Sequence, residues 1–284
     1  MIAGALWLTS CGALGDSSED MPPPSPALWE AVGPQGERAW LFGTIHALAD
    51  GTEWRTPALE EVLAETDLLM VEIGDLSDRE DAAEAFQSRA FDVGLPPIME
   101  RVSAEKRDVL VGALAAADID PDALVHTDTW AAAMQLGNAA RCSNAANGVD
   151  RALIAQFEEP RSLESFESQF AAFDNLPDDA QSDLLVSVAE ESDCRAGIAR
   201  RAAWLAGDLD SIENSLLTSF RGNDALQKAL VDDRNALYAE QVVAFHAANT
   251  ETDLLVAVGV GHMLGETGLP DLLQQNGYTV TRIQ

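Results

Sequence analysis

Alternating apolar and polar residues open the folded part of the sequence. Residues 28–30 alternate, residues 33–36 supply a turn, and residues 39–42 return as a second apolar run. This pattern is typical of a β-hairpin. It is followed by a predicted helix over residues 57–65 and by residues 68–73, which are apolar on both faces as in a buried parallel strand.

Helical spacing dominates the middle of the chain. Ala-rich segments between about residues 78 and 140 predict helices, and residues 149–157 and 166–247 predict more of them. Two short segments differ: residues 161–165 are predicted as a strand, and residues 96–99 are a candidate for another.

The strand pattern returns only at the end of the chain. Residues 254–258 are predicted as a buried strand, residues 269–276 as an amphipathic helix and residues 278–283 as a final alternating strand. We therefore expect an α/β fold: one domain over residues 28–284, with a central mixed sheet formed by the N- and C-terminal segments and a large helical insertion at about residues 78–250.

Composition narrows the possible partners. The 284 residues are 47% hydrophobic, enough for a substantial core, and 48 acidic residues outnumber 17 basic ones for a formal charge of −31. Such a charge repels phosphate backbones and anionic headgroups, so nucleic acid is not an expected partner.

The first residues resemble an export signal. Cys11 follows an apolar run and the residues Leu8-Thr9-Ser10, in the manner of a bacterial lipobox. In this interpretation residues 1–11 are the signal segment with the lipidated cysteine, and the Ser-, Pro- and acid-rich residues 12–27 are a flexible tether. The protein would be periplasmic and attached to a membrane only through the lipid on Cys11. The alternative is a frayed apolar N-terminus.

Two cysteines remain if Cys11 is lipidated. An even remainder in an exported protein predicts a disulfide between Cys142 and Cys194. Two buried free thiols are the alternative.

The first candidate site residues belong to a repeated motif, in which a predicted strand is followed by Gly-x-x-His. Gly43 leads to His46, and Gly259 leads through Gly261 to His262. Ligand sites gather at the carboxyl ends of strands in open α/β sheets, and glycine lets the backbone turn or approach a ligand there. A shared sheet would bring the two imidazoles together, with the three glycines shaping the site.

A third predicted strand carries Glu72 inside an apolar run, where an unpaired buried carboxylate costs several kcal/mol. Either an ion pair with an arginine or a metal ion would compensate. Two imidazoles and a carboxylate form a common hydrolytic metal set. His46, Glu72 and His262 are therefore the predicted ligands of a divalent metal.

Two further residues complete the candidate site. Glu164 follows the short predicted strand and is the candidate general base, the alternative being an exposed charge. Arg234, on a predicted helix, would either fix a substrate carbonyl or carboxylate or neutralise Glu72 or Glu164. His126 and His246 lie in helical contexts and are predicted to be structural.

The order of these motifs resembles the TraB/GumN family, which includes the Tiki proteases and is grouped with the erythromycin esterase-like and ChaN-like folds. The resembling segments are residues 28–29, 41–46, 71–72, 148–150, 163–165 with Gln169, 204–208, 234–235, 258–262, 268–269 and 277–278. Ser165 departs from the threonine expected there but keeps the hydroxyl.

The resemblance implies an α/β fold with a helical insertion and a site made of the two Gly-x-x-His motifs and glutamates. Because Tiki members are metal-dependent peptidases, it also implies a hydrolase that uses Mn, Co or Zn to cut a peptide or a small-molecule substrate. The competing hypothesis is a non-enzymatic periplasmic binding protein that holds a peptide, metal or haem-like ligand in the same cleft.

Overall fold

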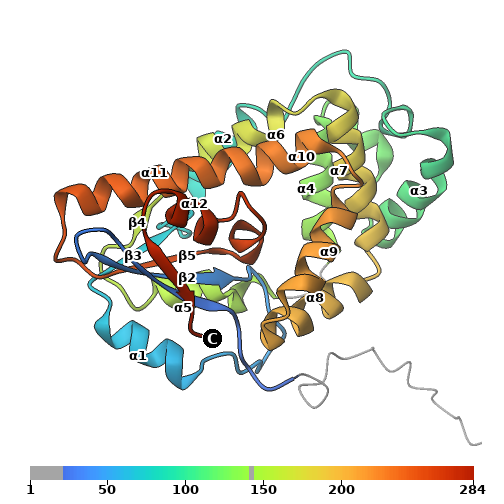
Figure 1. Cartoon of the computed structure of the whole chain (residues 1–284). Coiled ribbons are helices and arrows are strands. Elements are labelled where there is room, and N and C mark those ends of the chain that lie inside the picture. The colour runs from blue at the N-terminus through green and yellow to red at the C-terminus, as the bar shows by residue number, and fades with distance from the viewer. Residues whose placement is uncertain (1–21, 141–143) are drawn as a thin grey trace, which may run out of the picture.

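The fold is described from a computed structural model, shown in Figure 1. The structure describes residues 22–140 and 144–284. The predicted signal segment, most of the tether, Cys11 and Cys142 lie outside the described residues.

A six-stranded sheet forms the centre of the α/β part. Its strands are β1 (Leu28–Val32), β2 (Arg38–Thr44), β3 (Leu68–Val71), β4 (Arg161–Ser162), β5 (Leu254–Gly259) and β6 (Thr279–Arg282). The order across the sheet is β4-β3-β5-β2-β1-β6. Strands β4, β3, β5 and β2 run parallel, whereas β1 is antiparallel to both β2 and β6. The predicted mixed sheet of N- and C-terminal segments is confirmed. The described residues of the middle of the chain add the short β4 at one edge.

Helices supply the rest of the fold. The α-helices are α1 (Pro57–Glu65), α2 (Arg79–Gln87), α3 (Arg107–Ala116), α4 (Thr129–Ala139), α5 (Val149–Ile154), α6 (Phe166–Asp174), α7 (Asp178–Glu191), α8 (Arg195–Ala206), α9 (Leu209–Ser219), α10 (Asp224–Gln227), α11 (Asp233–Ala248) and α12 (Leu269–Gln275). Short 3₁₀ turns are η2 (Ile98–Glu100), η3 (Ala104–Lys106), η4 (Pro121–Leu124), η5 (Ala145–Asn147) and η7 (Val260–Met263), and η6 (Lys228–Asp232) is a π-helical turn.

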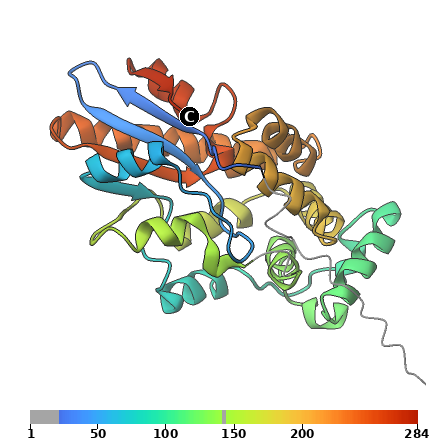
Figure 2. The same ribbon diagram turned by 90° about the horizontal axis from the view of Figure 1, so that it is seen from below.

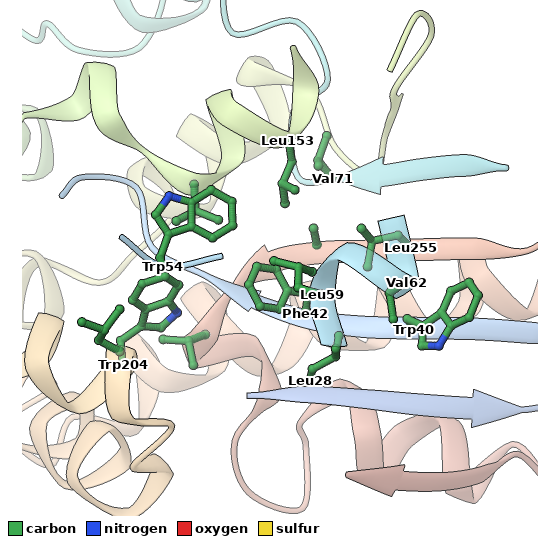
Figure 3. Close-up of a cluster of buried hydrophobic side chains, with 14 of the residues drawn as sticks. Leu28, Trp40, Phe42, Trp54, Leu59, Val62, Val71, Leu153, Trp204 and Leu255 are labelled. Carbon is green, nitrogen blue, oxygen red and sulfur yellow. The ribbon is translucent and has the colours of Figure 1, made fainter. Parts of the chain in front are cut away.

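Strand β5 is buried on both faces because helices cover the sheet on two sides. Leu255 points into a core shared with α1 and α5, shown in Figure 3. Val256, its neighbour in sequence, points into a second core shared with α11 and α12. Side chains of a strand alternate between faces, so this three-layer packing explains the continuous apolar run in the sequence.

Helices beyond the end of the sheet form a lobe, and three of them share an apolar core of their own. Helices α3, α4 and α7 pack around Leu110, Leu136 and Leu185. Figures 1 and 2 both place α3, α4, α8 and α9 beyond one end of the sheet, away from α1. This lobe therefore lies beyond one end of the sheet, and its described residues add no strands to it.

Local sequence sets several element boundaries. Helix α1 begins where Thr56 accepts a hydrogen bond from the amide of Leu59, with proline at the first helical position. The candidate strand at residues 96–99 is wrong. The carbonyl of Pro97 accepts from the amide of Glu100 at 2.7 Å and closes the 3₁₀ turn η2. In the described part of the chain, no helix is both long and apolar enough to cross a bilayer.

Candidate functional site

The predicted site residues follow the carboxyl ends of neighbouring parallel strands. Thr44 at the end of β2 is in register with Gly259 at the end of β5. Glu72 follows β3 directly, and its carbonyl accepts a hydrogen bond at 3.0 Å from the amide of Glu164, which follows β4. His46 lies two residues beyond β2. Segments far apart in sequence are thus brought to one edge of the sheet.

His46 is oriented by a carboxylate that the sequence motifs did not assign to the site. Its Nδ1 lies 2.9 Å from Oδ2 of Asp150, and Oδ1 of Asp150 accepts from the Thr44 hydroxyl at 2.6 Å. Asp150 is at the start of α5, just after Gly148. A Cβ at Gly148 would lie 2.4 Å from the carbonyl oxygen of His46, so only glycine allows α5 to approach this closely.

His262 is oriented in the same way by an amide. Its Nδ1 lies 2.6 Å from Oδ1 of Asn235 on α11. The other end of that amide donates to the carbonyl of Thr267 at 2.8 Å, so the oxygen must face His262. The imidazole therefore carries its proton on Nδ1, and its Nε2 lies 3.8 Å from Oε1 of Glu72.

Glu72 is the buried anion between these histidines. Its Oε1 accepts from the amide of Gly259 at 2.8 Å, and its Oε2 lies 2.6 Å from Nη2 of Arg234. Burial opposes its ionisation, but the imidazoles of His262 and His46, Arg234 and this amide together lower the pKa of Glu72 to about 2.

Gly259 marks the point on which the three side chains converge. A Cβ at this position would lie 3.2 Å from Oε1 of Glu72, 3.6 Å from Nε2 of His46 and 3.8 Å from Cδ2 of His262. Glycine leaves that space open. Gly43 is needed for a different reason, since a Cβ there would lie 2.9 Å from Cγ2 of Val260.

The two histidines differ in charge. The protein around His46 opposes its protonation although its side chain faces an open cavity, but the hydrogen bond to Asp150 and the charges of Asp150 and Glu72 raise the pKa of His46 to about 9. Burial is the main influence on His262 and lowers its pKa to about 4. The charge of Glu72 opposes this shift, and the charges of Arg234 and His46 add to it. At neutral pH the metal-free site thus holds one imidazolium, one neutral imidazole and one carboxylate.

Arg234 bridges the two glutamates. Besides Glu72, it contacts Glu164 through Nη2 at 2.5 Å and through Nε at 3.1 Å. Gln169 donates to the same Glu164 carboxylate at 3.0 Å. The carboxylates raise the pKa of Arg234 further above its usual value, although burial opposes this. Of the two roles that the sequence left open for Arg234, the geometry therefore favours neutralisation of Glu72 and Glu164.

A cavity of about 670 Å³ opens over this site. His46, Glu72 and His262 lie on its floor, and the side chain of His46 keeps 70% of its surface accessible there. Gly259, Gly261 and Arg234 also border the cavity. Glu164 does not appear among the described residues that line it, and neither do His126 and His246.

Three residues of the site were not predicted from the sequence to take part in its chemistry: Asp150, Asn235 and Thr44. Asp150 and Asn235 lie within segments already quoted for the family resemblance, but neither spacing nor composition shows that their side chains reach Nδ1 of a histidine. Only the packing of α5 and α11 against the sheet brings them there.

The predicted disulfide stays a prediction. Cys142 lies outside the described residues. The Sγ atom of Cys194 lies 3.9 Å from the carbonyl oxygen of Ala140.

The fold and the site together define an α/β protein with a histidine–glutamate centre at the strand ends. The chain belongs to the TraB/PrgY/gumN family, whose model matches residues 27–282. No curated protein and no solved structure was found to match it.

Proposed function

We propose that this protein is a metal-dependent hydrolase that cuts a peptide or a similar acyl bond. The observation that carries the proposal is the orientation of the two histidines. Asp150 contacts Nδ1 of His46, and Asn235 contacts Nδ1 of His262. Both Nε2 atoms are therefore turned to the space beside Gly259 and Glu72. Metal-binding histidines in proteins are typically oriented by such acceptors.

The donor chemistry fits a divalent metal ion such as Mn, Co or Zn. Two imidazole nitrogens and one carboxylate oxygen suit these ions. However, the described residues include no three His, Cys, Asp or Glu side chains already arranged to hold one. Glu72 is held by Gly259 and Arg234, so metal binding requires its carboxylate to move or to stay outside the ligand set.

Each residue of the chain has a defined part in this proposal. A bound divalent ion would polarise the scissile carbonyl and make water more acidic. His46 and His262 present their Nε2 atoms, held in place by Asp150 and Asn235. Glu72, which is ionised and lines the cavity, would join the ligand set if its carboxylate moved away from Arg234, and would otherwise balance the charge of the ion.

Glu164 as general base stays a prediction from the sequence. Both of its oxygens accept hydrogen bonds from Arg234, and one also accepts from Gln169. This arrangement favours a part in holding Arg234 beside Glu72. A base paired in this way would have to exchange its partners to reach water.

The test is metal uptake followed by cleavage of a mixed peptide pool. Metal-stripped protein is reloaded with Mn, Co or Zn, and bound metal is measured by elemental mass spectrometry. We expect H46A and H262A to lose both metal and turnover. H126A is the matched control, because His126 is exposed and does not border the cavity in the described structure. Unchanged metal content in both site variants would refute the metal assignment.

The competing function is a binding protein without catalysis. The pairing of Glu164 with Arg234 favours it, since the predicted base is then occupied. Wild-type protein that takes up metal and retains peptides from the pool but cleaves none with any of the three metals would support binding and contradict hydrolysis.

The lipid anchor on Cys11 and a periplasmic location belong to the same proposal and rest on the lipobox-like residues alone. We expect the expressed full chain to separate with membranes and C11S to be released. Equal membrane association of both proteins would contradict the lipid anchor.

A further inference from the structure

The cavity over the site extends well beyond the histidines into the helical lobe. Its walls beyond the strand ends come from α4, α6, α7, α8, α9 and η6. The apolar side chains that line these walls are Met134, Phe173, Val188, Leu216, Phe220 and Leu230. We call this part of the cavity the apolar chamber. It is continuous with the floor that holds His46, Glu72 and His262.

Two charged side chains that line the chamber, Arg200 and Glu191, are paired with each other. Nη2 of Arg200 donates to both oxygens of Glu191 at 2.9 Å. Near the floor, Arg234 is paired with Glu72 and Glu164. These charges are satisfied within the protein, so the surface left for a ligand in the chamber is mainly apolar.

A helix glycine keeps the chamber open. Gly137 lies within α4 and lines the cavity, although glycine inside a helix costs about 1 kcal/mol relative to alanine. A Cβ there would make only an ordinary contact, 3.5 Å from Cγ1 of Val188. The backbone therefore tolerates a side chain, and what glycine preserves is the open volume.

We propose that the apolar chamber binds a bulky apolar side chain of the substrate, such as leucine, methionine or phenylalanine, next to the scissile carbonyl. The inference rests on the proposed hydrolase function. Its physical basis is the contiguity of apolar walls and candidate catalytic groups in one cavity of about 670 Å³, a size typical of ligand sites. A substrate held at the histidines must place its neighbouring group in this chamber.

The first test uses the metal-loaded full chain and a mixed-sequence peptide pool, with cleavage sites read by mass spectrometry. Bulky apolar residues should be enriched beside the cut bonds, with kcat/KM at least about tenfold above that for serine in the same place. G137L fills the chamber and should remove most of this preference. G112L is the matched control, because Gly112 lies inside α3 and a Cβ there meets nothing within 4 Å.

The second test does not need turnover. Metal-stripped protein is titrated calorimetrically with N-acetyl-Gly-Gly-Phe-Gly-Gly-amide and with the matching serine peptide. We expect the phenylalanine peptide to bind at least about tenfold more tightly to wild type and G112L, and to lose that advantage in G137L.

The outcomes separate this inference from the proposed function. Cleavage without preference for bulky apolar residues overturns the chamber assignment and leaves the hydrolase standing. Absence of cleavage with any metal overturns the hydrolase, and the binding titration then decides the chamber by itself. Equal binding of the two peptides, or an unchanged advantage in G137L, refutes it.

Discussion

Replacing Asp150 with asparagine tests how the site controls His46. In the wild type, one carboxylate oxygen faces Nδ1 of His46 at 2.9 Å and the other accepts from Thr44 at 2.6 Å. Asparagine keeps the shape and can still accept from Thr44. Its amide would, however, donate to Nδ1, which places the proton of the neutral imidazole on Nε2 and removes the lone pair that a metal ion would need there.

The expected loss of metal affinity follows from the role of Asp150 in orienting His46. Loss of a residue that orients a metal-binding histidine typically lowers metal affinity or activity by about 10- to 100-fold, which is about 1.4–3 kcal/mol. The pKa of His46 should fall as well. Desolvation by the surrounding protein lowers this pKa, and its rise to about 9 depends on Asp150 first and on Glu72 second. Without the charge of Asp150, it should drop towards or below the ordinary value of about 6.5.

Two assays check these expectations on the same D150N protein. Metal affinity is measured by competition with a chromophoric chelator, and NMR of the imidazole nitrogens follows the tautomer and pKa of His46 in metal-free protein. D50N is the matched control, since Asp50 also accepts hydrogen bonds from two side chains but is exposed on a loop. Wild-type metal affinity together with an unchanged His46 pKa in D150N would refute the reasoning.

The remaining predictions concern stability. Indole Nε1 of Trp204 donates to the carbonyl of Gly43 at 2.8 Å, whereas Nε1 of the equally buried Trp130 has no partner among the described residues. W204F should therefore lower the free energy of unfolding in urea by about 1–3 kcal/mol more than W130F, and equal losses would contradict this. Burial lowers the pKa of His246, which contacts the Tyr278 hydroxyl at 2.9 Å. Its stabilising effect is present above the unfolded pKa of about 6.5 and is lost as pH falls below it, so H246Q should lose less stability than wild type between pH 8 and 5.5, and parallel losses would argue against it.

The fold was predictable where the hydrophobic pattern was one-sided or continuous. The helix at Pro57–Glu65 coincides with its prediction, and the two buried strands β3 and β5 were recognisable from their apolar runs. Residues 96–99 show the limit. Two prolines and an isoleucine look extended in a sequence, yet two backbone hydrogen bonds close this segment into a 3₁₀ turn.

The site was predictable as a set of strand-end residues and less so as chemistry. His46, Glu72 and His262 do meet around Gly259, because adjacent parallel strands end together. The pairing of Arg234 with both glutamates depends on where α11 crosses the sheet. The sequence pattern of a single helix does not predict that position. Asp150 and Asn235 could not be predicted for the same reason, because the sequence around a helix residue does not show which side chain of another segment it contacts.

The pairing of β1 with β6 has a consequence for engineering. It brings Gln284 against Pro26, where the glutamine amide donates to the proline carbonyl at 2.7 Å. A short linker could join residue 284 to residue 26, with new ends opened in an exposed loop of the helical lobe. In such a circular permutant β5 would precede β2, with only α12, β6 and β1 as named helices and strands between them. The two histidines, 216 positions apart in the natural chain, would be separated by about 42 positions and the linker. We therefore expect the pairing of β5 with β2, which brings the histidine turns together, to form earlier in folding.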